Sequence, residues 1–79
     1  QGNATFKGAQ YTLFYGETNQ NHAKDTPVKW QDESHPEVIK GKKASEQEVT
    51  LTIDKENQVA VKHLDISNYY WKETKAPSL

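Results

Sequence analysis

The chain has 79 residues, a net charge of −1 and no cysteine, with 33% hydrophobic and 27% charged residues. This length suits one small domain without disulfides, and two Trp, four Tyr and two Phe argue against disorder. All ten basic residues are lysines, so the chain lacks the arginine fork that reads guanine, and we expect no nucleic-acid partner. No apolar run approaches the ~20 residues that cross a bilayer, so we expect no membrane insertion.

The period-two alternation of β-strands recurs along the chain. Residues 10–15 (QYTLFY) predict the first strand. Residues 49–53 (VTLTI) alternate most strictly, and a polar turn then leads to a strand at 59–61, which predicts an antiparallel hairpin. Residues 69–74 (YYWKET) predict the last strand. Because no segment has a helical period, we expect an all-β fold, a small antiparallel β-sandwich in one domain over residues 1–79.

Residues 16–48 form a long polar insertion in this interpretation. Within it, Val28 and Trp30 follow Pro27 and predict a short strand. The sequence leaves two roles open for Trp30, a core residue or an exposed residue on which a ligand stacks.

The histidines and paired carboxylates indicate no metal site and no cofactor. His22, His35 and His63 lack the spacing of metal ligands. Asp32-Glu33 falls in a polar connection, so we interpret this pair as part of a solvated turn.

Strand parity predicts the core and one exception to it. The expected core residues are Phe6, Ala9, Tyr11, Leu13, Val49, Leu51, Ile53, Val59, Val61, Leu64, Tyr69 and Trp71. The same parity turns Glu73 toward the apolar interior with Tyr69 and Trp71. A carboxyl group buried there becomes neutral, and two roles stay open for it: a structural acid satisfied by a hydrogen bond, or a proton donor and relay at a dry site.

Three blocks of sequence resemble a known family. Residues 64–77 read LDISNYYWKETKAP, residues 6–13 read FKGAQYTL, and residues 58–64 read QVAVKHL. The first resembles the E-box of the Cna B-type, or SpaA-type, domains of Gram-positive pilins and surface adhesins: Leu, a short turn, Tyr, an apolar residue, Glu-Thr and Ala-Pro. The other two resemble the start of such a domain and the strand before its E-box.

The resemblance implies a prealbumin-like sandwich that forms a spontaneous isopeptide bond between a Lys on the first strand and an Asn or Asp on the last. Glu73 matches the catalytic Glu of the family, and Tyr11, Leu13, Tyr69 and Trp71 are the expected pocket around it. In the family the reactive Lys precedes the segment that residues 2–6 resemble, and the Asn or Asp follows the Ala-Pro. The resemblance therefore implies that this chain lacks both reactive residues, together with the first and last strands that bear them.

The expected function is that of a structural module in an extracellular, cell-wall-attached surface protein or pilus. Its partners would be complementary β-strands from the same or another chain. Two alternatives stay open: a split scaffold, a peptide ligase or catcher that joins two added strands, and an adhesin module that binds a host protein or glycan through residues 16–48. The bond formation would be autocatalytic rather than the turnover of an enzyme, unless the chain serves as a split peptide ligase.

Overall fold

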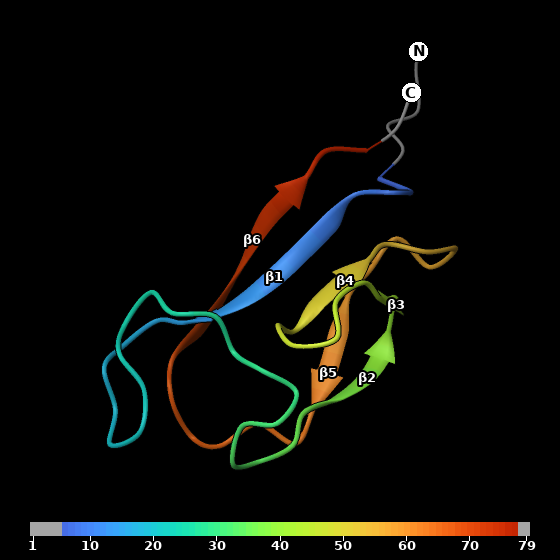
Figure 1. The fold of residues 1–79 in the computed structure, drawn as a ribbon. Coiled ribbons are helices and arrows are strands. Elements are labelled where there is room, and N and C mark those ends of the chain that lie inside the picture. The colour runs from blue at the N-terminus through green and yellow to red at the C-terminus, as the bar shows by residue number, and fades with distance from the viewer. Residues whose placement is uncertain (1–5, 78–79) are drawn as a thin grey trace.

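The computed structural model describes residues 6–77 and contains six strands in that range, with no helix (Figure 1). They are β1 (Gln10–Tyr15), β2 (Glu37–Lys40), β3 (Lys42–Lys43), β4 (Thr50–Thr52), β5 (Ala60–Lys62) and β6 (Tyr69–Lys75). One antiparallel sheet has the order β3-β4-β1-β6, and the second pairs β2 with β5. The expected fold, a small antiparallel β-sandwich, is confirmed. In the described part of the chain no helix could cross a membrane.

β1 is one of the two inner strands of the larger sheet. It pairs antiparallel with β6 from Tyr15↔Tyr69 to Gln10↔Lys75, and its first half pairs with β4 on the other side. The second half of β1 bonds on that same edge to residues 25–28. The Tyr15 amide donates to the Thr26 carbonyl, and the Val28 amide donates to the Leu13 carbonyl. Both edges of β1 are therefore used along its length.

The predicted hairpin between residues 49–53 and 59–61 is wrong, because β4 and β5 belong to different sheets. β4 pairs with β1 and β3, whereas β5 pairs with β2. The turn between them contains Asn57 in the left-handed region at φ 55°. The two alternating segments instead meet through their apolar faces, with Val59 packed against the core that contains Leu51. Alternation identified both strands but could not distinguish hydrogen-bonded neighbours from partners across a sandwich.

Gly41 carries the chain from one sheet to the other between β2 and β3. Its φ of +96° lies in the region that residues with a side chain rarely adopt. A Cβ atom here would lie 3.1 Å from the Thr52 carbonyl oxygen and 3.3 Å from a methyl group of Val59. Glycine is therefore required by both the backbone conformation and the packing.

The core lies toward the β4 side of the molecule. The predicted core residues Ala9, Leu13, Val49, Leu51 and Ile53 are buried. Phe6 is wrong as a core residue, since it is 47% exposed. Three residues absent from the expected list, Tyr15, Val28 and Trp30, complete the core.

The segment 16–48 is therefore more integrated than its polarity suggested. Val28 and Trp30 do not lie in a regular strand. The isolated bridge Phe14↔Pro27 joins this segment to β1, and the bridge Lys29↔Glu48 joins two parts of the segment itself. The segment supplies two core side chains, and β2 and β3 as well.

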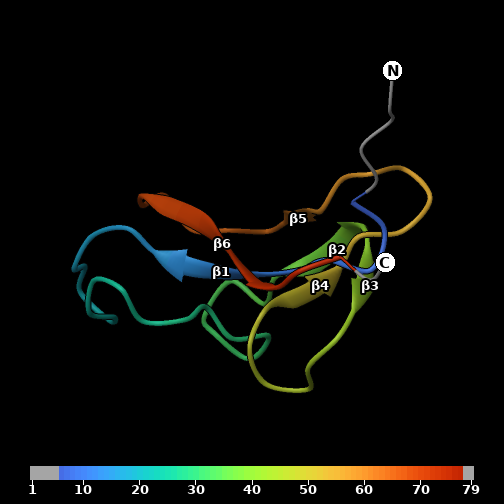
Figure 2. The ribbon, with the colours of Figure 1, turned by 90° about the horizontal axis from the view of Figure 1, so that it is seen from above.

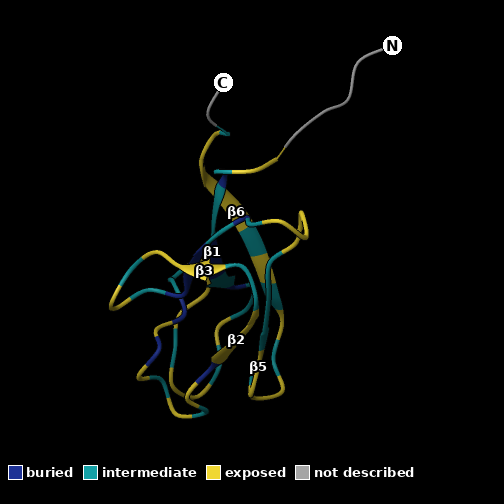
Figure 3. Ribbon diagram, turned by 90° about the vertical axis from the view of Figure 1, so that its right-hand side faces the viewer, coloured by how far each residue is buried: buried dark blue, intermediate teal, exposed yellow. Residues whose placement is uncertain are grey.

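The remaining predicted core residues are only partly buried. Tyr11, Val59, Val61, Leu64, Tyr69 and Trp71 have intermediate exposure, and the last five pack against the core. In the burial colouring of Figure 3, β5 and β6 carry teal and yellow rather than dark blue. This flank of the core is therefore incompletely covered by the described residues.

We predict that Gly41→Ala lowers the free energy of unfolding by about 1–3 kcal/mol, because it forces an alanine to a positive φ and against the Thr52 carbonyl. Urea denaturation followed by tryptophan fluorescence measures the change. Gly16→Ala is the matched control: it causes the same loss of unfolded-chain entropy, and its nearest contacts, with Asn68, begin at 3.3 Å. Equal stability changes in the two variants would contradict the role given to Gly41.

Candidate functional site

Glu73 lies near the end of β6, opposite Tyr11 of β1. The Tyr11 hydroxyl donates a long hydrogen bond of 3.4 Å to the Glu73 carboxylate. The register shifts at this point, since Tyr11 opposes Glu73 while Gln10 opposes Lys75, so Thr74 is the extra residue of a β-bulge. The bulge lies next to Glu73.

Parity was right about the side of the sheet on which Glu73 lies, but the expected burial is wrong. Tyr11, Leu13 and Tyr15 alternate along β1 and oppose Glu73, Trp71 and Tyr69. Glu73 thus shares the face of the sheet that bears the core, yet its side chain is exposed. The reason is its position at the end of the sheet, where no described residue covers that face as the core does around Leu13.

An apolar groove runs along this uncovered face between β5 and β6. One hollow of about 300 Å³ is lined by Leu13, Val59, Ala60, Val61, Leu64, Tyr69, Tyr70 and Trp71. A second of about 310 Å³ is lined by Phe6, Tyr11, Ile53, Asn57, Gln58, Val59 and Trp71. The two hollows share Val59 and Trp71, so they are adjacent, and we refer to them together as the groove. Figure 2 shows β5 and β6 along the same margin of the molecule.

Both strands that border the groove are edge strands. Among the described residues β6 pairs only with β1, and β5 pairs only with β2. Each strand therefore has one edge with backbone groups that bond to no other strand in that range. Open edges beside an apolar groove are the features by which sheets accept a further strand.

The pocket expected around Glu73 is divided by this geometry. Tyr11 contacts Glu73 directly. Leu13, Tyr69 and Trp71 line one hollow of the groove, and Tyr11 and Trp71 line the other. Tyr69 lies four residues from Glu73, about 13 Å along an extended strand. The expected residues thus share one face but do not form a single pocket.

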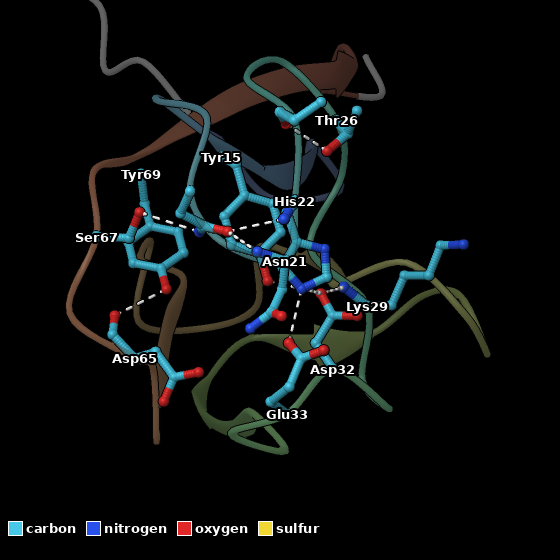
Figure 4. Close-up of polar contacts among 12 residues, drawn as sticks. Tyr15, Asn21, His22, Thr26, Lys29, Asp32, Glu33, Asp65, Ser67 and Tyr69 are labelled. Carbon is cyan, nitrogen blue, oxygen red and sulfur yellow. Dashed lines mark hydrogen bonds and ion pairs between the residues drawn. The ribbon is translucent and has the colours of Figure 1, made fainter.

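The fold also brings together a cluster of polar residues that lie apart in the sequence (Figure 4). His22 Nε2 lies 2.7 Å from a Glu33 carboxylate oxygen and 3.8 Å from one of Asp32. The His22 ring stacks on Tyr15 with ring centroids 4.3 Å apart, and the Tyr15 hydroxyl donates a 2.7 Å hydrogen bond to Asp32. Asp32-Glu33 is therefore not simply a solvated turn, because the fold brings His22 to it.

The local turn around Asn19 sets the position of His22. The Asn19 side-chain oxygen accepts hydrogen bonds from the amides of Asn21 and His22, an arrangement that favours a tight polar turn. This Asx signal was present in the sequence at Asn19, but the contact with residues 32–33 depends on the tertiary fold.

The cluster perturbs two titratable groups. Burial, and then the hydrogen bond to Asp32, raise the pKa of the Tyr15 hydroxyl well above its usual value of 10.0. The hydrogen bond with His22 lowers the pKa of Glu33 below its usual 4.5. Both shifts keep the groups in the forms that make the cluster, a neutral phenol and an ionised carboxylate.

Trp30 is a core residue rather than a stacking platform. It is 8% exposed, and its indole N–H donates to the Ser45 carbonyl at 2.8 Å.

Comparisons of the chain with models of protein families, with curated proteins and with solved structures find no match.

We predict that Tyr15→Phe lowers the free energy of unfolding by about 1–3 kcal/mol at pH 7, because it leaves the 89%-covered Asp32 carboxylate without the phenol donor. Tyr70→Phe is the matched control, since Tyr70 also donates to an aspartate, Asp25 at 2.8 Å, but is exposed. Chemical denaturation of the two variants measures the difference. Equal costs would contradict a special contribution from the buried pair.

We also predict that the stability falls as the pH rises above about 10. An unfolded tyrosine ionises near 10.0, whereas the folded Tyr15 keeps its proton to higher pH, so the unfolded state loses protons first and is favoured. The stability that Tyr15 contributes is therefore complete below pH 10. Denaturation curves between pH 8 and 11 should show a smaller decline for Tyr15→Phe than for the parent chain.

Proposed function

We propose that this chain is a structural module of an extracellular surface protein or pilus, and that it receives complementary β-strands along the β5–β6 groove. In this proposal Glu73 promotes an isopeptide bond between a Lys and an Asn or Asp on those strands. The observation that carries the proposal is the open apolar groove between two edge strands, with Glu73 on the same face of β6. The E-box resemblance of residues 64–77 supports it.

The position of Glu73 suits a carboxyl group that acts only after a strand has docked. It is exposed to water in this chain. A strand laid over the groove would remove water from Glu73 and Tyr11, and desolvation favours the neutral carboxylic acid. A neutral acid can donate a hydrogen bond to the side-chain carbonyl oxygen of the attacked Asn or Asp.

The bond-forming step balances without a cofactor. The neutral Lys amine attacks the side-chain carbonyl carbon of the Asn or Asp, and Glu73 donates a hydrogen bond to the carbonyl oxygen. Glu73 then passes the proton that leaves the Lys nitrogen to the leaving group. An Asn loses ammonia and an Asp loses water as the new amide forms.

Two features support strand docking apart from the bond chemistry. The groove is predominantly lined by apolar and aromatic side chains, which a strand with alternating apolar residues would cover. The free edge of β6 extends over Tyr69–Lys75 and offers backbone donors and acceptors along seven residues. A strand-accepting scaffold without covalent bond formation, the split-catcher alternative, rests on the same groove.

The adhesin alternative receives less support. Trp30, the aromatic residue of segment 16–48 considered for ligand stacking, is buried and hydrogen-bonded. Binding of a host protein or glycan through this segment would have to use its polar side chains and the exposed aliphatic side chains of Val38 and Ile39, without an exposed Trp, Tyr or Phe.

The test is intact-mass spectrometry of the full-length protein that contains this segment. We predict a mass lower by one ammonia or one water than the sequence mass, and the full sequence mass in Glu73→Gln. Glu46→Gln is the matched control, because Glu46 is 93% exposed and pairs weakly with Lys43 at 3.9 Å. It should keep the mass deficit. Because Glu73→Gln should lack the bond, a protease should cleave this variant faster than the parent protein.

The outcomes separate the parts of the proposal. An unchanged mass in the parent protein would remove the isopeptide bond and leave strand docking as the function. A mass deficit that persists in Glu73→Gln would leave the bond and overturn the role of Glu73.

A further inference from the structure

The cluster of His22, Asp32 and Glu33 is independent of the groove and of Glu73. One ligand atom from each residue can be chosen so that the three lie within 4.8 Å of one another. Both carboxylates lie within ion-pair distance of the same imidazole nitrogen, His22 Nε2, at 2.7 Å for Glu33 and 3.8 Å for Asp32. Two carboxylates therefore share one partner, which carries at most one positive charge.

Two of the three side chains, those of His22 and Asp32, are held in place by residues outside the ligand set. Tyr15 stacks on the His22 ring and donates its hydroxyl to Asp32. The Lys29 backbone amide donates a second hydrogen bond to the same Asp32 oxygen at 3.0 Å. In Figure 4 the Lys29 side chain extends away from Asp32, so its ammonium group does not neutralise the carboxylate. Hydrogen-bonded carboxylates and an oriented imidazole are the supports that metal ligands need.

A polar hollow opens beside the cluster. It has a volume of about 170 Å³ and is lined by His22 and Glu33 together with Tyr15, Asn19, Gln20, Asn21, Asp65 and Ile66. The side chain of His22 is 20% exposed and that of Glu33 is 52% exposed, so both ligand groups can be reached from solvent. The hollow leaves room for the water molecules that complete a coordination shell.

We propose that His22, Asp32 and Glu33 bind a divalent transition-metal ion, with zinc as the ion that this ligand set suits best. The ion replaces the proton shared between His22 Nε2 and Glu33, and its two positive charges balance the two carboxylates. One imidazole and two carboxylates with one open position match the ligand types and the coordination number of zinc. The bound ion would tie residue 22 to residues 32–33 and so close segment 16–35 on itself.

A second histidine–carboxylate pair in the chain provides an internal comparison. His63 Nδ1 lies 3.1 Å from Glu37, but the third group there is the Lys62 ammonium, 3.9 Å from the same carboxylate oxygen. A cation in place of the second carboxylate repels a metal ion. The His63 pair therefore has the same two ligand types without the site.

The test is a titration of the ¹⁵N-labelled chain with zinc chloride, followed by ¹H–¹⁵N spectra and isothermal calorimetry. We expect one saturable site whose shifts centre on residues 19–22 and 32–33. His22→Gln and Glu33→Gln should each weaken binding at least about tenfold. His63→Gln, the matched control, should bind zinc as the parent chain does.

Unchanged core resonances of Val49 and Leu51 will show that each variant is folded. Absence of saturable binding in the parent chain would overturn the proposal. Binding that survives in His22→Gln, or that His63→Gln weakens equally, would overturn it too. Neither result affects the role proposed for Glu73. The mass measurement detects the isopeptide bond, whereas the titration detects zinc at residues 22 and 32–33.

Discussion

The pairing of β1 with β6 is the interaction on which the rest of the structure depends. It joins residues more than fifty positions apart and aligns Tyr11, Leu13 and Tyr15 with Glu73, Trp71 and Tyr69 on one face. The same strand β1 pairs with β4 and with residues 25–28 on its other edge, so it organises the larger sheet. A shift of this register by one residue would turn the side chains of one strand to the other face, so Trp71 would no longer share a face with Leu13.

This arrangement also accounts for the two candidate sites, which lie at opposite ends of β1. At Gln10 and Tyr11 the face of the sheet is uncovered, the bulge at Thr74 interrupts the ladder, and Glu73 meets solvent. At Tyr15 the same face is covered, because His22 stacks on the ring and Asp32 accepts its hydroxyl hydrogen. Glu73 and the polar cluster therefore lie at opposite ends of β1, and the apolar groove follows the paired residues of β6 between Tyr69 and Trp71.

The groove and the cluster differ in the kind of side chain that they hold. The groove holds mainly apolar side chains that gain free energy if another strand removes them from water. The cluster holds charged groups that are already partly desolvated and satisfied by one another. The groove is thus suited to a polypeptide partner, and the cluster is suited to a small cation.

Alternation within short segments was sufficient to predict β-structure at residues 10–15, 49–53, 59–61 and 69–74, because a strand buried on one face must repeat every two residues. Parity also identified the side of the sheet on which Glu73 lies. Local patterns carry no information about which strand pairs with which, so the hairpin between β4 and β5 was expected and does not exist.

Only the tertiary structure decided how far each residue is covered. Phe6 and Glu73 are exposed because no described residue packs over them, whereas Val28 and Trp30 are buried because a polar segment folds back onto the core. The approach of His22 to Asp32 and Glu33 likewise depends on contacts with Tyr15, which no spacing in the sequence encodes. The sequence determined the strands and their faces, since these follow from neighbouring residues. The fold determined burial and the composition of the sites, since these depend on residues that are distant along the chain.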